Sequence, residues 1–260
     1  MGIFTAVPTM YVALLQAVAA GAPTAQLRYA ISGGAPLPLA VLEAFEKTFG
    51  ATVHEGYGLT ETSPVASFNR VGEEIHPGTV GRRIWGVDVM VADAEKDHEI
   101  VELPRGEMGE IVIRGHNLFK GYLGRAEANR EAVVDGWFRT GDLGTIDDED
   151  LITIVDRKKD MIVRNGYNVY PTEVENVLVR HEAVQTAAVF GVPDRVHGQE
   201  IAAAVVLKSG AEATEEELIG FVKERIAAFK FPRIVHFVPE LPLGPSGKVL
   251  KRELAREFGS

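Results

Sequence analysis

The chain has 260 residues, of which 46% are hydrophobic and 25% are charged, and its formal net charge at pH 7 is −10. This composition is typical of a soluble globular protein, and the negative charge argues against a nucleic-acid or anionic-membrane surface. The absence of cysteine excludes disulfides, a thiolate nucleophile and cysteine-bound zinc. The apolar N-terminus lacks the basic region of a signal peptide, and no apolar run reaches the roughly 18 residues of a membrane span. We therefore expect a cytoplasmic protein.

The first part of the chain predicts alternating helices and strands. A helix is expected from Pro8, where apolar residues recur at helical spacing until Gly21. A buried strand at 27–32, a glycine-rich turn, a helix from Pro38 that Gly50 ends, a strand at 51–53 and a polar loop at 54–64 follow in order. This order is that of an α/β unit whose site lies at the strand ends.

From Gly78 onward short strands are separated by glycine and proline, which favours a small β-barrel or an antiparallel sheet. A strand at 151–155 leads into the charged run 156–160, and a short apolar segment at 161–163 follows. The last part predicts a helix at 171–180, strands at 186–192 and 201–207, a helix capped by Thr214 and Glu217, a strand at 234–238 and a helix at 250–258. This pattern indicates a small β-α-β-β-α-β domain.

Two glycine-containing segments are candidate binding loops. Gly33-Gly34-Ala35-Pro36 follows a strand directly, so its backbone could lie against a flat ring or an acyl chain, although taken alone the segment is more simply explained as a tight turn. In the segment 57–62, Tyr57 offers a stacking face, the hydroxyls of Thr60 and Thr62 can donate to phosphate, and Glu61 is a hard oxygen ligand suited to Mg²⁺. Threonine and glutamate also serve as helix caps, which is the alternative explanation.

Three single residues are further candidates. Asp142, expected in a Gly-Asp turn, could accept both hydroxyls of a ribose, or form an Asx turn. Arg157 could donate to hydroxyls or phosphate, or belong to a solvated linker. Lys248, in Pro245-Ser246-Gly247-Lys248, could reach a developing negative charge, although a lone loop lysine is usually just solvated.

Taken in order, the motifs resemble those of the adenylate-forming (AMP-dependent synthetase/ligase) superfamily, and most closely a fatty acyl-CoA synthetase. The seven motifs that carry the resemblance are SGGAPLP, YGLTETSP, GTVGRRIWG, GEIVIRGHNLFKGYL, DGWFRTGDLG, DRKKDMIVRNGYNVYPTEVE and PLGPSGKVLKREL. The resemblance implies a partial large N-terminal domain at 1–158, with a βα sheet unit and small β-barrel. A small mobile α+β C-terminal domain would follow at 159–260.

The resemblance also implies a role for each candidate. Residues 33–36 would border adenine and acyl chain, Tyr57 would stack on adenine, and Asp142 and Arg157 would hold the ribose. Thr60 would contact phosphate and Glu61 would bind Mg²⁺. Lys248 would approach the carboxylate and α-phosphate, Lys159 would mark a hinge where many members have aspartate, and Gly166 would face the thiol. The implied cofactors are ATP or AMP, Mg²⁺ and coenzyme A.

The family's phosphate-binding loop ending in Pro-Lys-Gly is missing, so we expect the C-terminal half of such an enzyme, inactive or severely impaired on its own. The full enzyme would convert a fatty-type carboxylic acid to acyl-AMP and then to acyl-CoA. The alternatives are a ligase that loads an acyl-carrier protein and a non-catalytic nucleotide- or acyl-binding remnant. We expect no nucleic-acid partner and no integral membrane segment, and a homodimer is possible.

Overall fold

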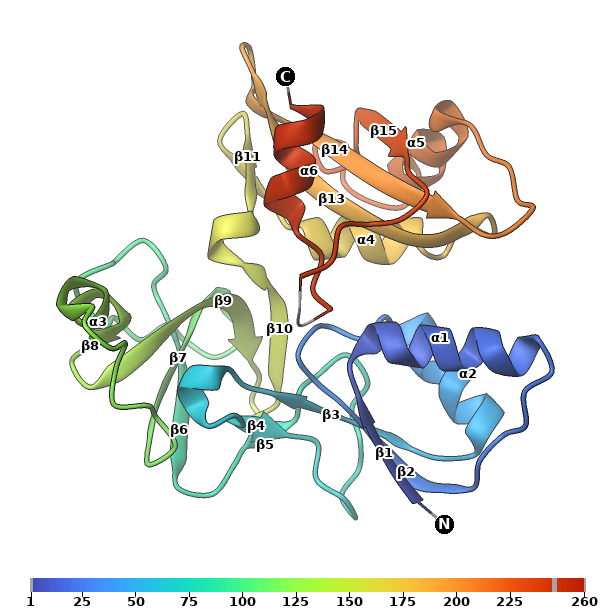
Figure 1. Ribbon diagram of the computed structural model, residues 1–260. Helices are drawn as coiled ribbons and strands as arrows, with labels where there is room; N and C mark the ends of the chain where they lie inside the picture. Colours follow the sequence, from blue (N-terminus) through green and yellow to red (C-terminus); the bar gives the residue numbers. More distant parts are fainter. Residues whose placement is uncertain (1, 245–246, 260) are drawn as a thin grey trace. The chain divides into compact units, whose positions relative to one another are not determined.

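A computed structural model of the chain describes residues 2–244 and 247–259. Its contacts divide into two compact units, Met1–Ile154 and Val155–Ser260 (Figure 1). The domain boundary expected after residue 158 lies four residues beyond this division and stays a prediction. The mixed α/β and α+β architecture predicted from the sequence is confirmed, with an antiparallel sheet rather than a closed barrel in the middle of the chain.

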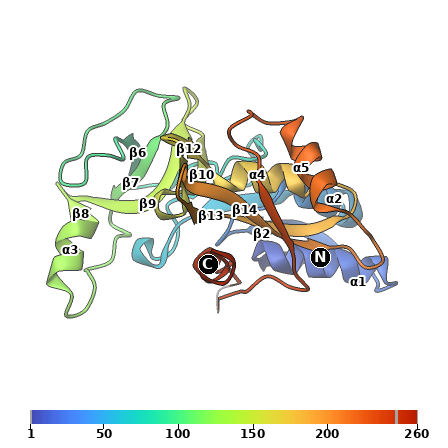
Figure 2. The same cartoon turned by 90° about the horizontal axis from the view of Figure 1, so that it is seen from above.

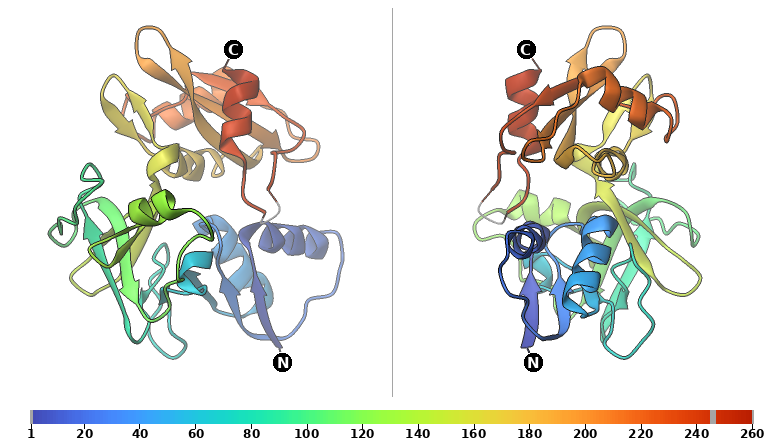
Figure 3. Two further views of the ribbon diagram at one scale, coloured as in Figure 1. Left: turned by 60° about the vertical axis from the view of Figure 1, so that its left-hand side comes forward. Right: turned by 90° about the vertical axis from the view of Figure 1, so that its right-hand side faces the viewer.

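The first sheet has the strand order β1-β2-β3-β4-β5, with β1, β2 and β3 parallel. Helices α1 and α2 lie beside the parallel strands (Figure 3). They pack there through Tyr11 and Phe45, whose ring centroids are 4.6 Å apart. The elements of this layer are β1 (Gly2–Ala6), α1 (Pro8–Ala19), β2 (Leu27–Ser32), α2 (Leu39–Phe49), β3 (Val53–Tyr57), β4 (Ser67–Phe68) and β5 (Arg82–Arg83).

Strand β3 is longer than the sequence indicated. The expected strand at 51–53 and loop from residue 54 were wrong, because β3 runs from Val53 to Tyr57. Its polar residues His54 and Glu55 are buried inside the sheet, and His54 Nδ1 donates to Asn69 O at 2.9 Å. Both side chains form hydrogen bonds with backbone groups, so these polar residues can be buried and the strand continues through them.

The second sheet has the order β10-β9-β7-β6, and β8 pairs with β9. Apolar side chains that include Ile111, Ile113 and Ile152 form its core, against which Tyr57 and Leu59 pack. Its strands are β6 (Val87–Ala92), β7 (Gly109–Gly115), β8 (Val133–Val134), β9 (Trp137–Ile146) and β10 (Ile152–Arg157), with α3 (Ala126–Ala132) before β8.

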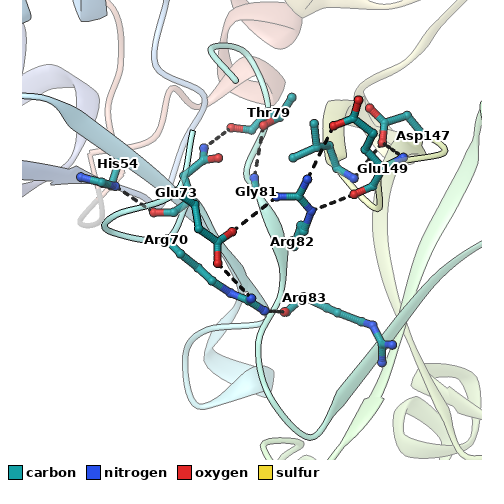
Figure 4. Close-up of polar contacts among 11 residues, drawn as sticks. His54, Arg70, Glu73, Thr79, Gly81, Arg82, Arg83, Asp147 and Glu149 are labelled. Atoms are coloured by element: carbon teal, nitrogen blue, oxygen red, sulfur yellow. Dashed lines mark hydrogen bonds and ion pairs between the residues drawn. The ribbon is translucent and has the colours of Figure 1, made fainter. Parts of the chain in front are cut away.

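Arg82 ties two loops of this unit together (Figure 4). Its Nε donates to Glu149 O at 2.8 Å, and its Nη1 lies 3.4 Å from Glu73 Oε2. Glu73 also pairs with Arg70, at 3.3 Å. Arg82 of the GTVGRRIWG motif therefore holds two loops of this unit together.

The second unit is a five-stranded sheet with helices on both faces. Helices α4 and α5 pack on one face with Val189 and Val205, and α6 packs on the other with Ala188 and Phe190 (Figure 2). Its elements are β11 (Ile162–Arg164), β12 (Tyr167–Val169), α4 (Pro171–Leu178), β13 (Val184–Asp194), β14 (Gly198–Leu207), α5 (Glu215–Lys223), β15 (Ile234–Phe237) and α6 (Lys251–Phe258). The predicted capping box of α5 is present, with Glu217 N donating to Thr214 Oγ1 at 3.2 Å.

The longest helix described is α1, with 12 residues. Among residues 2–244 and 247–259, no helix is both long and apolar enough to cross a membrane.

Candidate nucleotide site

Two of the predicted site residues meet across different strands, one at the end of β3 and the other inside β9. Tyr57 is the last residue of β3, and its hydroxyl donates to Asp142 Oδ2 of β9 at 2.7 Å. The two residues are 85 positions apart in the sequence. The first unit thus places an aromatic ring beside a carboxylate that is only 5% exposed.

The Gly-Asp turn predicted for Asp142 was wrong, because Asp142 lies within the long strand β9. The register pairs Glu110 with Leu143 and Val112 with Arg139, so residues 140–142 of β9 lie opposite Ile111 alone. Gly141 has φ +71°, a conformation that favours glycine. The resulting bulge, residues 140–142, displaces Asp142 from the regular ladder.

Two hydrogen bonds between the Thr140 hydroxyl and backbone groups fix this bulge. The hydroxyl of Thr140 donates to Ile111 O at 2.6 Å and accepts from Asp142 N at 3.0 Å. The carboxylate is therefore held by its own segment as well as by the Tyr57 hydroxyl.

The glycine turn 33–36 lies next to the same strand end. Gly33 N donates to Ala6 O at 3.4 Å, and a Cβ built on Gly33 would meet Gly56 O at 3.4 Å. Gly34 and Pro36 are exposed, whereas Ala35 is half-buried. The structure thus brings this turn beside the segment that carries Tyr57.

Thr60 and Glu61 form a short 3₁₀ helix, η1 (Thr60–Thr62), directly after β3. The loop folds tightly at Gly58, where an added Cβ would lie 1.9 Å from Pro64 O. Thr60 is exposed and Glu61 half-buried. The sequence prediction of a polar segment here is consistent with these positions, while the phosphate and metal roles stay predictions.

Tyr122 is a neighbour of Glu61 that sequence reasoning missed. Its hydroxyl donates to Glu61 Oε1 at 2.9 Å. Burial, together with the hydrogen bond to Glu61 and the charge of Glu61, raises the pKa of Tyr122 to about 12. The phenol therefore stays protonated at neutral pH and acts as a donor to the carboxylate.

Glu55 is a second residue that the sequence did not single out. It is buried in β3, and this burial raises its pKa to about 7 although the backbone N–H groups of Gly78 and Leu37 oppose the shift. Within the described part of the chain, the nearby side-chain oxygens Tyr11 Oη and Ser32 Oγ are buried without a hydrogen-bond partner. Glu55 follows the buried strand residue Val53 by two positions, and this alternation was the signal that could have identified its position on the buried face of the strand.

Arg157, Gly166 and Lys248 belong to the second unit. Arg157 ends β10, and its N–H donates to Asp156 Oδ1 at 2.8 Å. Gly166, with φ +78°, forms the two-residue turn of the β11–β12 hairpin together with Asn165. Lys248 is half-buried, and its carbonyl accepts from Gly244 N at 2.8 Å. Pro245 and Ser246 of the same motif lie outside the described residues.

Two family models match the chain. The model of the AMP-binding enzymes matches residues 1–123, and that of the AMP-binding enzyme C-terminal domain matches residues 173–248. The chain belongs to the AMP-binding enzyme family.

Two curated proteins and one solved structure illustrate how similar the chain is to known members of the family. A long-chain-fatty-acid–CoA ligase of Bacillus subtilis (strain 168) is 40% identical over 98% of the chain and 45% of the relative. A feruloyl-CoA synthase of an Amycolatopsis species is 40% identical over 97% of the chain and 51% of the relative. The crystal structure of ATP-bound MatB from Rhodopseudomonas palustris is 35% identical with a TM-score of 0.92, covering 100% of this chain and 51% of that one. The chain thus spans about half the length of the relatives it matches.

Proposed function

We propose that this AMP-binding chain is part of an ATP-dependent acyl-CoA ligase that forms an acyl-adenylate and then a thioester. The observation that carries the proposal is the contact of Tyr57 with Asp142 beside the glycine turn 33–36. A ring face, a buried carboxylate and an exposed backbone turn together suit a nucleoside. The names of the curated relatives, which are CoA ligases, support the same chemistry.

The nucleoside would use residues of the first unit. Adenine would stack on the ring of Tyr57 and lie along residues 33–36, and the Asp142 carboxylate would accept hydrogen bonds from the ribose hydroxyls. Asp142 has two carboxylate oxygens, so it can accept from a ribose hydroxyl in addition to Tyr57. Arg157, at the end of β10, would be a further donor to the ribose.

In the first half-reaction, a carboxylate oxygen of the acid attacks the α-phosphorus of ATP, a new P–O bond forms, and pyrophosphate leaves. Thr60 would donate to a phosphate oxygen. Lys248 would bring its ammonium group to the negative charge that develops on the pentavalent phosphorus. In the second half-reaction, the CoA thiol attacks the acyl carbon, loses its proton and displaces AMP, with Gly166 on the thiol-facing surface.

Glu61 fits the requirements of a Mg²⁺ ligand. Mg²⁺ in nucleotide sites is typically bound by one or two carboxylates together with phosphate oxygens and water. Tyr122 occupies Oε1 of Glu61 as a donor, and a carboxylate has a second oxygen with which to bind a cation. When bound, the ion would neutralise phosphate charge.

The acid we propose is a monocarboxylic, fatty-type acid, because residues 64–66 after the loop are small or apolar and no basic residue lies among them. The relatives named for long-chain fatty acids support this choice, while the feruloyl-CoA synthases support an aromatic acid as the alternative. The thiol acceptor we propose is free CoA and not a carrier protein, because these relatives are named as CoA ligases or CoA synthases. Whether the chain acts as a homodimer in the cytoplasm stays a prediction.

The nucleotide site can be tested by calorimetry of the 260-residue chain with AMP. We expect binding that Asp142→Asn weakens by at least tenfold, since a charged hydrogen bond is worth about 1.5–3 kcal/mol. Asp88→Asn is the matched control, because Asp88 is an exposed carboxylate on β6 of the same sheet and pairs with Arg83 and Arg114. Equal AMP affinity in the Asp142→Asn and Asp88→Asn variants would contradict the proposal.

The two catalytic steps require a separate assay. Since the chain spans about half the length of its relatives, we propose that it adenylates poorly on its own. Efficient ATP–pyrophosphate exchange by the purified chain, abolished by Lys248→Ala, would contradict this part of the proposal. Comparing CoA with a pantetheinylated carrier protein as acceptor for a synthetic acyl-adenylate distinguishes the two acceptors.

A further inference from the structure

A buried ion pair joins strands β7 and β9 beside the bulge that carries Asp142. Arg139 Nη2 lies 2.6 Å and Nε 3.1 Å from Glu110 Oε2. The side chains of Arg139 and Glu110 are only 7% and 3% exposed. The two residues belong to the GEIVIRG and FRTGD segments, 29 positions apart, and neither was a predicted site residue.

Both partners make further hydrogen bonds to the backbone. Glu110 Oε1 accepts from Gly141 N at 3.0 Å, so one carboxylate binds both the arginine and the bulge. Arg139 donates to the carbonyl oxygens of Lys96, Glu99 and Asp93, the last two at 3.3 and 3.4 Å. A continuous set of contacts thus runs from the loop after β6, through the pair, to the residue next to Asp142.

Stability alone is a weak reason for such a pair. Desolvation of two charges offsets much of their attraction, and apolar side chains of similar volume often stabilise a fold as well or better. The geometry here provides something that apolar side chains do not, a fixed acceptor for the N–H of Gly141. That N–H belongs to a residue with φ +71°, in the part of β9 where the regular ladder is interrupted.

We infer that Glu110 and Arg139 are positioning residues, which hold the β9 bulge so that the Asp142 carboxylate is directed at the ribose diol of the nucleotide. This inference rests on the proposed nucleotide site. It assigns the selectivity for a ribose with both hydroxyls to a buried pair that itself touches no ligand. Thr140 contributes to the same arrangement through its hydrogen bonds to Ile111 O and Asp142 N.

Glu110→Gln is the variant that tests the inference most directly. A glutamine has one oxygen and one NH₂ group where the carboxylate has two acceptors. If its oxygen faces Gly141, its NH₂ faces the donors of Arg139; if its oxygen faces Arg139, its NH₂ faces the Gly141 N–H. Either orientation sets two donors against each other, so the bulge must shift.

The experiment compares AMP with 2′,3′-dideoxy-AMP by calorimetry on the 260-residue chain. The two ligands share adenine and phosphate and differ only in the diol, so the ratio of their affinities reports the contacts to the ribose hydroxyls and not the remainder of the site. The Asp142→Asn variant shows how much of this ratio belongs to Asp142. We expect the unsubstituted chain to prefer AMP by at least tenfold, and Glu110→Gln to reduce this ratio to within about twofold of unity. Asp142→Asn gives the reference value for a lost diol contact.

Glu200→Gln is the matched control. Glu200 forms a similarly enclosed, bidentate pair with Arg164 in the second unit, at 2.7 and 2.9 Å with side chains 12% and 11% exposed. It should lower the unfolding temperature and leave the AMP preference unchanged. If Glu110→Gln does not fold, Arg139→Lys replaces it, since lysine keeps the charge and loses the fork.

The outcomes separate the inference from the function on which it rests. An undiminished preference for AMP in a folded Glu110→Gln or Arg139→Lys chain overturns the inference and leaves the nucleotide site standing. No preference for AMP over its dideoxy analogue in the unsubstituted chain overturns the ribose role of Asp142, and the inference with it. A reduced preference in both variants, with the control unchanged, supports the inference.

Discussion

The hydroxyl of Tyr57 donates a hydrogen bond of 2.7 Å to the carboxylate of Asp142, and so links the two sheets of the first unit. Each residue has a role in the proposed site, the ring as a stacking face and the carboxylate as an acceptor. Their contact orients both before a nucleotide arrives. Orienting groups in advance reduces the entropy that binding must overcome.

Two substitutions at Tyr57 separate the ring from the hydroxyl. Tyr57→Ala removes the stacking face and should weaken AMP binding by at least tenfold, because stacking on an aromatic side chain is worth about 1–3 kcal/mol. Tyr57→Phe keeps the ring and removes a hydrogen bond that lies within the protein and not to the ligand, so its effect on AMP binding should stay below tenfold. Titration calorimetry with AMP measures both. Equal losses in the two variants would show that the hydroxyl, and not the ring, carries the interaction.

Glu55 predicts a pH dependence of stability. Burial raises its pKa from 4.5 to about 7 in the folded chain, so the folded state binds more protons than the unfolded state between these values. The contribution of Glu55 to the free energy of unfolding is complete below about pH 4.5 and is lost as the pH rises through about 7. At 1.36 kcal/mol per pKa unit, the loss is about 3 kcal/mol.

Urea unfolding at pH 5 and pH 8 tests this dependence. Glu55→Gln cannot ionise, and its amide oxygen can still accept from the backbone N–H of Gly78 or Leu37. The variant should therefore lose less stability than the unsubstituted chain when the pH is raised. Glu43→Gln, at an ordinary position of α2, serves as the comparison. Parallel pH profiles for the Glu55→Gln and unsubstituted chains would exclude the titration of Glu55 as the cause.

Local signals in the sequence were sufficient for many elements. Strand β2 has the predicted bounds because Leu27, Tyr29 and Ile31 alternate directly before the glycine turn, and helices α1 and α2 begin near prolines and end near glycines. These signals depend only on residues that are close together in the sequence, so a sequence pattern is enough to predict them. Strand β1 was missed because its pairing with β2 is a long-range contact that its own five residues do not encode.

The candidate site was only partly predictable for the same reason. Tyr57 and Asp142 stand in motifs that the sequence displays, yet their contact depends on how two sheets pack. Glu110 and Arg139 look like ordinary charged residues of strands, and only the fold buries them together. The β11–β12 hairpin was not predicted, although its Asn165-Gly166 turn is a local signal typical of a two-residue hairpin.

The capping box of α5 gives a prediction of stability. Thr214 Oγ1 accepts from Glu217 N, and Glu217 Oε2 accepts from Thr214 N at 2.8 Å. Thr214→Ala should lower the free energy of unfolding by about 1 kcal/mol, because one N–H of the first turn loses its partner. Thr214→Ser keeps the hydroxyl and should cost only a few tenths. Urea denaturation measures both, and an alanine variant as stable as the serine variant would contradict the role of the cap.

The ion pair between Lys251 and Glu175 anchors α6 to the rest of the second unit. Glu175 Oε1 lies 2.8 Å from Lys251 Nζ and accepts from Val189 N at 2.7 Å, and burial raises the pKa of this carboxyl group. Lys251→Met leaves the carboxylate without its cation, which should cost about 3 kcal/mol at pH 8.

The cost should be smaller at pH 5, where the isolated Glu175 can take up a proton and lose its charge. Its folded pKa then lies above its unfolded value, so stability falls as the pH rises. Thermal unfolding of Lys251→Met at both pH values is compared with Arg252→Met, which removes an exposed charge from the next position of α6. If Lys251→Met loses no more stability than Arg252→Met at pH 8, the pair does not anchor the helix, and the apolar packing of Leu254, Ala255 and Phe258 must hold α6 in place.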